Sequence, residues 1–341
     1  MAYTTINKST DHFNTKLYTG NGSTQSITGV GFQPDWTWIK DRSAAQNHML
    51  FDAVRGVTKW LESNGTAAEQ TYAPTLTAFD SDGFSLGNSG DVNGNSATFA
   101  SWNWKANGAG STNYNGSINS TVSANTTAGF SIVSYTGTGS NATVGHGLSQ
   151  EPDILIIKNR SVSNRWVVYT KLIDGTFDFL QLNTSDAKTN SSVTPFTSSV
   201  FSVINNADSG TSGNNYIAYA FHSVKAYSKM GIYTGNGNAD GTFIYTGFKP
   251  AWVLIKAIER SAKWFLWDNK REPFNLMDSV MVPSTSEAEN TDPSFYMDFL
   301  SNGFKLRNNF GDLNASGEKF IYMAFASAPL VGTNNIPATA R

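Results

Sequence analysis

Two pairs of aspartates offer the side chains that glycoside hydrolysis would need. Asp52 and Asp268 stand at equivalent places in two similar segments of the chain, and Asp80 and Asp82 flank a turn. A glycosidase requires two carboxyl groups facing one cleft. A third similar segment has Thr170 near that place, so a structural role at the end of a hairpin is the more economical interpretation. We therefore expect a protein that is not an enzyme.

The histidines form no pattern that would suit a base or a metal site. His12, His48, His146 and His222 stand at unrelated positions, and we expect turn or surface residues. The chain has no cysteine and no Gly-x-Ser-x-Gly motif. Residues 91–95 carry oxygen ligands at alternate positions but lack the closing glutamate of a calcium loop. We expect no cofactor and no bound metal.

A basic pair recurs where each of three predicted buried strands ends. Such a pair could bind an anion or a sugar as a repeated surface contact. It could equally pair with a carboxylate or cap carbonyl groups at the end of a hairpin. The second interpretation is favoured, and the candidate binding residues are Lys40, Arg42, Lys158, Arg160, Lys256 and Arg260.

Two tryptophans form a second candidate binding site. Trp102 and Trp104 alternate with polar residues, so both point to one face of a predicted strand. That face is expected to be core. An exposed aromatic patch that holds a carbohydrate ring or a partner protein is the alternative.

These candidates all lie in three long repeats. A Tyr-Thr-Gly-x-Gly motif begins at Tyr18, Tyr135 and Tyr233, and each copy continues with a proline, an apolar run and a lysine. The period of roughly a hundred residues exceeds that of solenoid units and suits a domain. The predicted organisation is module 1 over 1–106, a Gly/Asn/Ser/Thr-rich connector over 107–128, module 2 over 129–228, module 3 over 229–330 and a tail over 331–341.

Strand signals dominate each repeat. Apolar runs at 36–40, 154–158 and 252–256 are followed by a polar turn and a second apolar run, which predicts β-hairpins. We predict an all-β protein of three tandem homologous β-sandwich or jelly-roll modules. Helix is limited to a turn or two within 51–61, and the connector has one strand at 116–118. Modules 2 and 3 should pack together, while module 1 sits more freely.

The composition excludes several classes of partner. With 24 Lys+Arg against 26 Asp+Glu, the net charge is -2, which gives no electrostatic reason to bind nucleic acid or an anionic membrane. No apolar run is long enough for a transmembrane helix, and the N-terminus lacks the apolar stretch of a signal peptide. We expect the product to fold where it is made, without membrane insertion.

Five segments carry a specific resemblance: 13–22, 82–87, 101–106, 144–148 and 215–221. They resemble a repeat family of tailed bacteriophages, familiar from phages of marine bacteria and cyanobacteria and often placed among tail-fibre or other virion structural proteins. The resemblance covers residues 13–329 and brings no catalytic residues with it.

The resemblance implies a structural protein on the exterior of the phage particle, made in the host cytoplasm. A tail fibre or tail appendage with a role in host attachment is the first expectation, and a capsid decoration protein is the alternative. A carbohydrate-binding or glycan-cleaving module is the third. The implied partners are other tail or capsid proteins and a host-surface glycan, with homo-oligomers or many copies per particle. The chain lacks coiled-coil heptads, and three internal modules could mimic a trimer within one chain.

Overall fold

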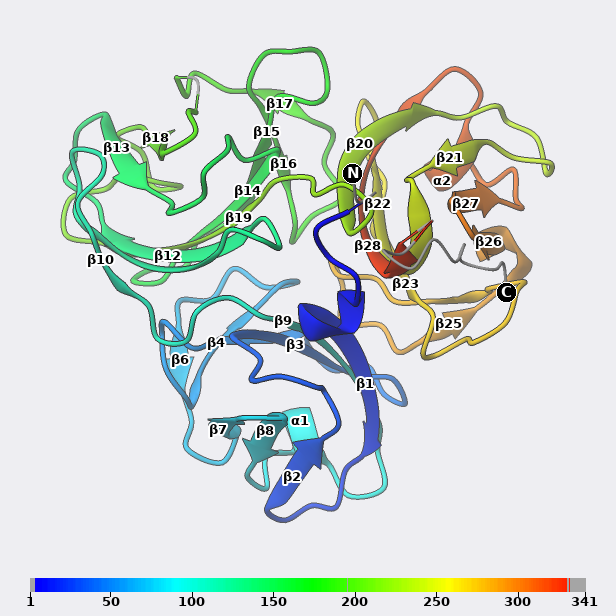
Figure 1. Cartoon of the computed structure of the whole chain (residues 1–341), viewed down its shortest axis with the longest axis horizontal. Helices are drawn as coiled ribbons and strands as arrows, with labels where there is room; N and C mark the ends of the chain where they lie inside the picture. The colour runs from blue at the N-terminus through cyan, green and yellow to red at the C-terminus, as the bar shows by residue number, and fades with distance from the viewer. Residues whose placement is uncertain (1–3, 195, 330, 332–341) are drawn as a thin grey trace.

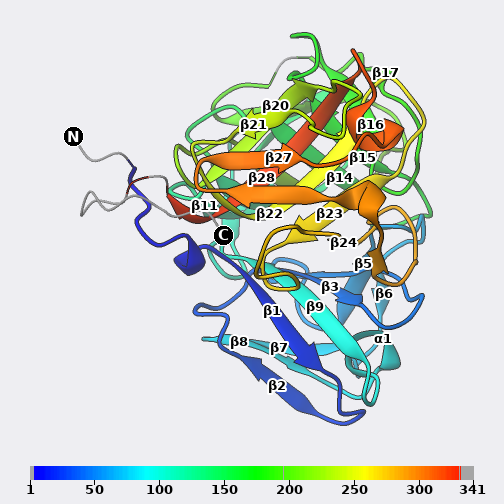
Figure 2. The same cartoon turned by 90° about the vertical axis from the view of Figure 1, so that its right-hand side faces the viewer.

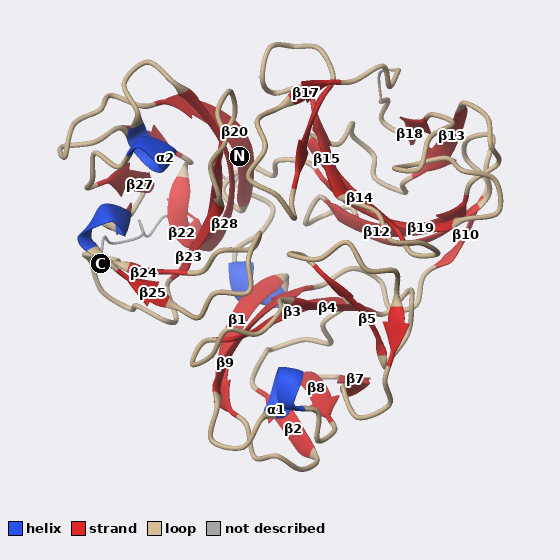
Figure 3. Ribbon diagram, turned by 180° about the vertical axis from the view of Figure 1, so that it is seen from behind, coloured by secondary structure: helices blue, strands red, loops and turns tan. Residues whose placement is uncertain are grey.

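The computed structural model describes residues 4–194, 196–329 and 331. Antiparallel strands make up almost all of the regular structure, which confirms the all-β prediction. The described helices are short: η1 (Ser9–Asp11), α1 (Gly90–Asn93), η2 (Pro293–Phe295) and α2 (Gly311–Asn314). Three lobes surround a common centre (Figure 1). The short helices α1 and α2 lie against the strands of their lobes (Figure 3), and each contributes one residue, Val92 or Leu313, to the core of its lobe.

Lobe 1 (residues 13–104) has one large and one small sheet. The large sheet has the order β1 (Phe13–Thr19), β9 (Thr98–Trp104), β3 (Trp36–Asp41), β4 (Met49–Asp52), β5 (Lys59–Glu62) and β6 (Gln70–Thr71). The small sheet has the order β2 (Gln25–Thr28), β8 (Gly83–Leu86) and β7 (Leu76–Asp80).

Lobe 2 (residues 111–221) repeats this order with an extra hairpin at one edge. Its large sheet runs β10 (Ser111–Asn113), β11 (Ser120–Asn125), β12 (Phe130–Thr136), β19 (Asn215–Phe221), β14 (Ile154–Asn159), β15 (Trp166–Thr170), β16 (Asp178–Gln181) and β17 (Thr189–Asn190). Its small sheet pairs only β13 (Ala142–Gly145) with β18 (Val200–Val203). The strand that forms a hairpin with β8 in lobe 1, and with β27 in lobe 3, therefore has no counterpart in the small sheet described for lobe 2.

Lobe 3 (residues 228–329) again has the same central order. Its large sheet runs β20 (Ser228–Thr234), β28 (Lys319–Pro329), β22 (Phe248–Ala257) and β23 (Trp264–Asp268). Its small sheets are β21 (Phe243–Tyr245), β27 (Gly303–Leu306) and β26 (Met297–Leu300), and the pair β24 (Ser279–Val280) and β25 (Asn290–Thr291).

Each large sheet is buried on both faces, which explains the continuous apolar runs of the sequence. In β14, Ile154 and Ile156 point into a central core shared by all three lobes, whereas Leu155 and Ile157 point into the core of lobe 2. The same alternation holds in the other two lobes. The sheets therefore act as walls between one common core and three separate ones.

The repeated Tyr-Thr-Gly-x-Gly motif closes each lobe in the same way. The hydroxyl groups of Tyr18, Tyr135 and Tyr233 donate to main-chain carbonyls 2.6 to 2.9 Å away, just before the last strand of the lobe. A Cβ on the first glycine of the motif, such as Gly20, would meet a main-chain oxygen at 2.1 Å. The motif is therefore a structural turn in which glycine is sterically required.

Three expectations about the chain's organisation are wrong. Module 1 does not sit freely, because its tryptophans help to form the core that all three lobes share. The connector is not an exposed linker, because β10 and β11 extend the large sheet of lobe 2. In place of a strand at 116–118, Gly116 and Ile118 form isolated β-bridges to Val144. No described helix lies within 51–61. Most of the predicted tail, residues 332–341, lies outside the described residues.

Candidate functional site

Two of the predicted basic residues join different lobes. Arg160 of lobe 2 makes two hydrogen bonds of 2.9 Å to the carboxylate of Glu69 in lobe 1. Arg42 of lobe 1 makes the same bidentate contact with the carboxylate of Glu289 in lobe 3, with hydrogen bonds of 2.9 and 2.8 Å. We call these contacts the 1–2 seam and the 3–1 seam. The charged pairs hold the lobes together and are mostly covered from solvent.

A buried carboxylate extends the ionic network of the 1–2 seam. Asp52 at the end of β4 pairs with Arg55, and Arg55 lies 3.4 Å from Glu69. The hydroxyl of Tyr219, from lobe 2, donates to Asp52 at 2.7 Å. Asp52 is thus held by charge and hydrogen bonds inside the protein, as the hairpin-end interpretation expects.

The 3–1 seam repeats this network with different residues. Asp268 pairs with Arg271 at 2.5 Å, and Arg271 reaches Glu289 at 3.0 Å. The indole of Trp102, from lobe 1, donates to Asp268 at 3.0 Å. Burial alone would raise the pKa of Asp268, but the Arg271 guanidinium outweighs burial, so this pKa is lowered.

The two glutamates respond in the same direction. Burial would raise the pKa of Glu69, but hydrogen bonds and charge from Arg160 and Arg55 lower it overall. Arg42 and Arg271 likewise lower the pKa of Glu289 against the effect of burial. Both carboxylates therefore stay ionised in their seams.

The 2–3 seam has the same main-chain contact, but its described residues form no such network. The amide of Lys188 donates to the carbonyl of Ile258 at 2.8 Å, as Glu69 does to Arg160. Ile258 thus stands where the other seams have an arginine. Thr170 replaces Asp52 in the sheet register, and the buried Ile173 follows it by three residues, as Arg55 follows Asp52.

The charged side chains near the 2–3 seam turn back to their own lobes. Lys188 pairs with Asp174 and Asp178 at 3.3 and 3.2 Å. Arg260 pairs with Asp312 and Glu318 at 3.3 and 3.9 Å. The predicted equivalence of Arg260 with the other two arginines is therefore wrong, because Ile258 occupies that position.

The three predicted lysines are buried, so the surface-contact alternative is wrong for them and they cap carbonyl groups, as the favoured interpretation expects. Lys40, Lys158 and Lys256 have no exposed surface, and their ammonium groups donate to main-chain carbonyls. Two of these bonds cross a seam: Lys158 reaches Thr66 at 2.9 Å, and Lys256 reaches Ser185 at 3.3 Å. Burial lowers the pKa of each lysine to about 8.

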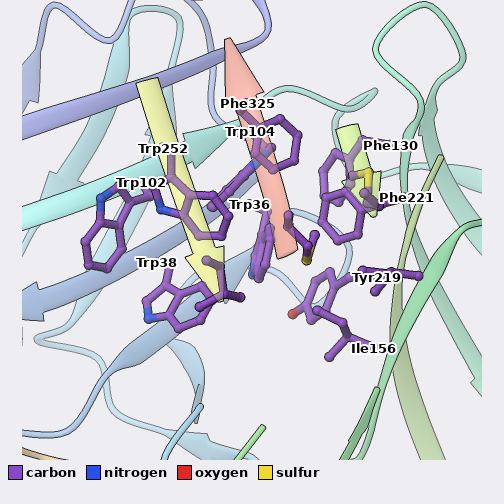
Figure 4. Close-up of a cluster of buried hydrophobic side chains, with 14 of the residues drawn as sticks. Trp36, Trp38, Trp102, Trp104, Phe130, Ile156, Tyr219, Phe221, Trp252 and Phe325 are labelled. Carbon is purple, nitrogen blue, oxygen red and sulfur yellow. The ribbon is translucent and has the colours of Figure 1, made fainter. Parts of the chain in front are cut away.

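The two predicted tryptophans also lie in the interior, so the surface-patch alternative is wrong. Trp102 and Trp104 are at most 1% exposed. Figure 4 shows them within the central cluster, where the Trp104 ring lies 5.6 Å from that of Trp252 in lobe 3. Trp36 stacks on Tyr219 of lobe 2 at 4.5 Å. The aromatic residues join all three lobes.

The remaining chemical candidates are not assembled into one site. Asp80 accepts a hydrogen bond from Ser85, and Asp82 accepts two from the amides of a neighbouring turn. Residues 91–93 of the calcium-like segment lie in α1. Among the described residues, no group of three or more His, Asp or Glu side chains could hold a metal ion. His48, His146 and His222 are buried, so the surface part of the prediction is wrong for them; each lies outside regular structure, next to the end of a strand.

A pair of exposed aromatic residues that sequence reasoning missed lies on one strand of lobe 3. Phe243 and Tyr245, two residues apart on β21, are 43% and 50% exposed. A hollow of about 280 Å³ beside Tyr245 is also lined by Lys229, Met230 and Ser223. The available signal was an aromatic–apolar–aromatic strand in the third repeat, where the others have small residues.

Comparison with known proteins identifies the family of this chain. A family model described as "Domain of unknown function (DUF7483)" matches residues 8–329, which include all three lobes. The chain belongs to this family. No curated protein and no solved structure matches it. Within the described part of the chain, no helix is long and apolar enough to cross a membrane.

Proposed function

We propose that the three lobes are tandem homologous β-sandwich modules that close into a ring, as a single-chain counterpart of a trimer. Their large sheets share one strand order, and the same main-chain contact recurs at each seam. Head-to-tail contacts of one kind give a closed ring when the rotation between units completes a circle. The family match over all three lobes supports the whole ring as the working unit.

On this basis the protein is a non-enzymatic structural component of a bacteriophage particle, displayed on its exterior as a tail fibre or tail appendage that contacts the host surface. The observation that carries the proposal is the closed ring itself. Its charged and aromatic candidate residues stabilise the seams and the shared core, which is what an architectural protein requires. The resemblance of the repeats to phage virion proteins supports the assignment to a phage particle.

Labelling and counting on intact particles test this proposal. An antibody raised against the chain should mark the tail, and quantitative mass spectrometry should give a small multiple of six copies per particle. Absence of the chain from purified particles would overturn the proposal. Release of sugar products from host polysaccharide by the purified chain would overturn the non-enzymatic part.

A capsid decoration protein is the second candidate. The compact three-lobed body favours it, because the described chain has no elongated shaft (Figure 2), whereas a threefold unit matches the local threefold positions of a head shell. Uniform antibody labelling of the head and hundreds of copies per particle would select this candidate over the tail.

A further inference from the structure

One face of lobe 3 presents aromatic rings to solvent. Phe243 and Tyr245 alternate with Ile244 along β21, and Ile244 is buried in the core of the lobe. The two aromatic side chains therefore project from the opposite, outer face of the strand. Their separation of two residues places them about 6.6 Å apart along the strand, given a rise of about 3.3 Å per residue.

The rings are supported by their neighbours. The ammonium group of Lys229 lies 5.5 Å from the centre of the Tyr245 ring and donates to the Tyr245 carbonyl at 2.7 Å. Gly303 on β27 lies beneath Phe243, since a Cβ there would be 3.1 Å from the phenyl ring. The aromatic surface is thus held in place before any ligand arrives.

The fold does not require these aromatic residues. In lobe 1, Ile27 pairs with Phe84 as Ile244 pairs with Phe304 in lobe 3, and the residues flanking Ile27 are Ser26 and Thr28. In lobe 2, Val144 occupies this place and is flanked by Thr143 and Gly145. Lobe 3 therefore exposes two rings where the equivalent strands carry small residues.

Charged groups of both signs surround the rings. Lys305, directly opposite Phe243 in the sheet, pairs with Asp240 at 2.6 Å. Arg307 lies 3.4 Å from Asp240 and 3.5 Å from Asp298. These cations supply hydrogen-bond donors and the carboxylates supply acceptors, and they pair with one another, which suits a ligand with many hydroxyl groups and no net charge.

The hollow at the end of β21 gives the face a pocket. It has a volume of about 280 Å³, close to the lower end of the range for small-ligand sites, and Tyr245 forms one wall. Lys229 and Ser223 contribute polar groups, and Met230 contributes an apolar surface.

We infer that this outer face of lobe 3 binds the pyranose units of a neutral polysaccharide. Tyr245 and Phe243 stack on the apolar faces of the sugar rings. Lys229, Lys305 and Asp298 hydrogen-bond to the hydroxyl groups. The inference rests on the proposed role in host attachment and assigns that role to one lobe of the three.

Affinity electrophoresis of the full chain tests the inference. The gels contain a neutral polysaccharide (dextran, galactomannan, xyloglucan or mixed-linkage β-glucan) or the anionic polygalacturonate. We expect retardation by at least one neutral polymer. The double variant Phe243→Ser/Tyr245→Thr, which carries the residues of lobe 1, should bind about tenfold more weakly or worse.

A matched control removes an exposed tyrosine elsewhere. Tyr114→Ser changes a 75% exposed side chain in the connector and should leave retardation unchanged. Circular dichroism establishes that each variant is folded. The inference is overturned if no neutral polymer retards the native chain, if polygalacturonate alone does so, or if the double variant is retarded equally. These outcomes are independent of the antibody labelling, which tests the virion role separately.

Discussion

The 1–2 and 2–3 seams make the same main-chain contact with opposite chemistry. In the first, a chain of charges runs from Asp52 through Arg55 and Glu69 to Arg160. In the second, isoleucines occupy the arginine positions. Ion pairs lose hydration on burial, and replacing them with packed apolar residues is often neutral or stabilising. The main chain and the shared core therefore set the geometry of each seam. Either charged or apolar side chains can complete the contact between the lobes.

The largest expected effect comes from breaking the ionic seam at its centre. Arg55→Ala leaves Asp52 and Glu69 buried without their shared partner, so the free energy of unfolding should fall by about 3–5 kcal/mol. Denaturant unfolding at pH 7 measures it. Arg271→Ala should behave alike, because it occupies the same place in the 3–1 seam. A loss below about 1 kcal/mol in both variants would contradict the importance of the networks.

A smaller effect of opposite sign is expected when the ionic seam is exchanged for the apolar one. The combined variant Asp52→Thr, Arg55→Ile, Glu69→Leu and Arg160→Ile gives the 1–2 seam an apolar character like that of the 2–3 seam. We expect the free energy of unfolding to stay level or rise by about 1–4 kcal/mol. A large fall in the midpoint of thermal unfolding would show that the ion pairs are required for this seam to form.

Acid should separate the two kinds of seam. The folded-state pKa values of Glu69 and Glu289 are lowered, so the unfolded chain binds protons first. Their stabilisation is present above the unfolded pKa of about 4.5 and is lost as pH falls through the lower folded value. As pH falls, the protection of main-chain amides from hydrogen exchange should therefore be lost at the 1–2 and 3–1 seams before it is lost at the 2–3 seam. Simultaneous opening of all three would contradict this order.

The smallest effect is expected at Arg260, which lies near the 2–3 seam but pairs within its own lobe. Its side chain is 38% exposed, and its partners lie 3.3 and 3.9 Å away. Arg260→Ala should change the free energy of unfolding by less than about 1 kcal/mol. A loss comparable to that of Arg160→Ala would show that Arg260 holds the seam after all.

Features that depend on neighbouring residues could be predicted from the sequence. Continuous apolar runs predicted the buried strands at 36–40, 154–158 and 252–256, and the polar turns after them predicted hairpins, which form as β3–β4, β14–β15 and β22–β23. These predictions succeeded because strand periodicity and turn chemistry act over a few residues.

The positions of the candidate residues in space depend on contacts between distant parts of the chain. Trp102 faces Asp268 of another lobe across 166 positions of sequence, and Asp52 meets Tyr219 across 167. Continuous apolar runs predicted buried strands, but no local pattern tells which distant segment covers each face, so the tryptophans and lysines kept a surface alternative. Closing the three lobes around one core supplied the second cover, and that burial required each charge at the seams to find a partner or give way to isoleucine.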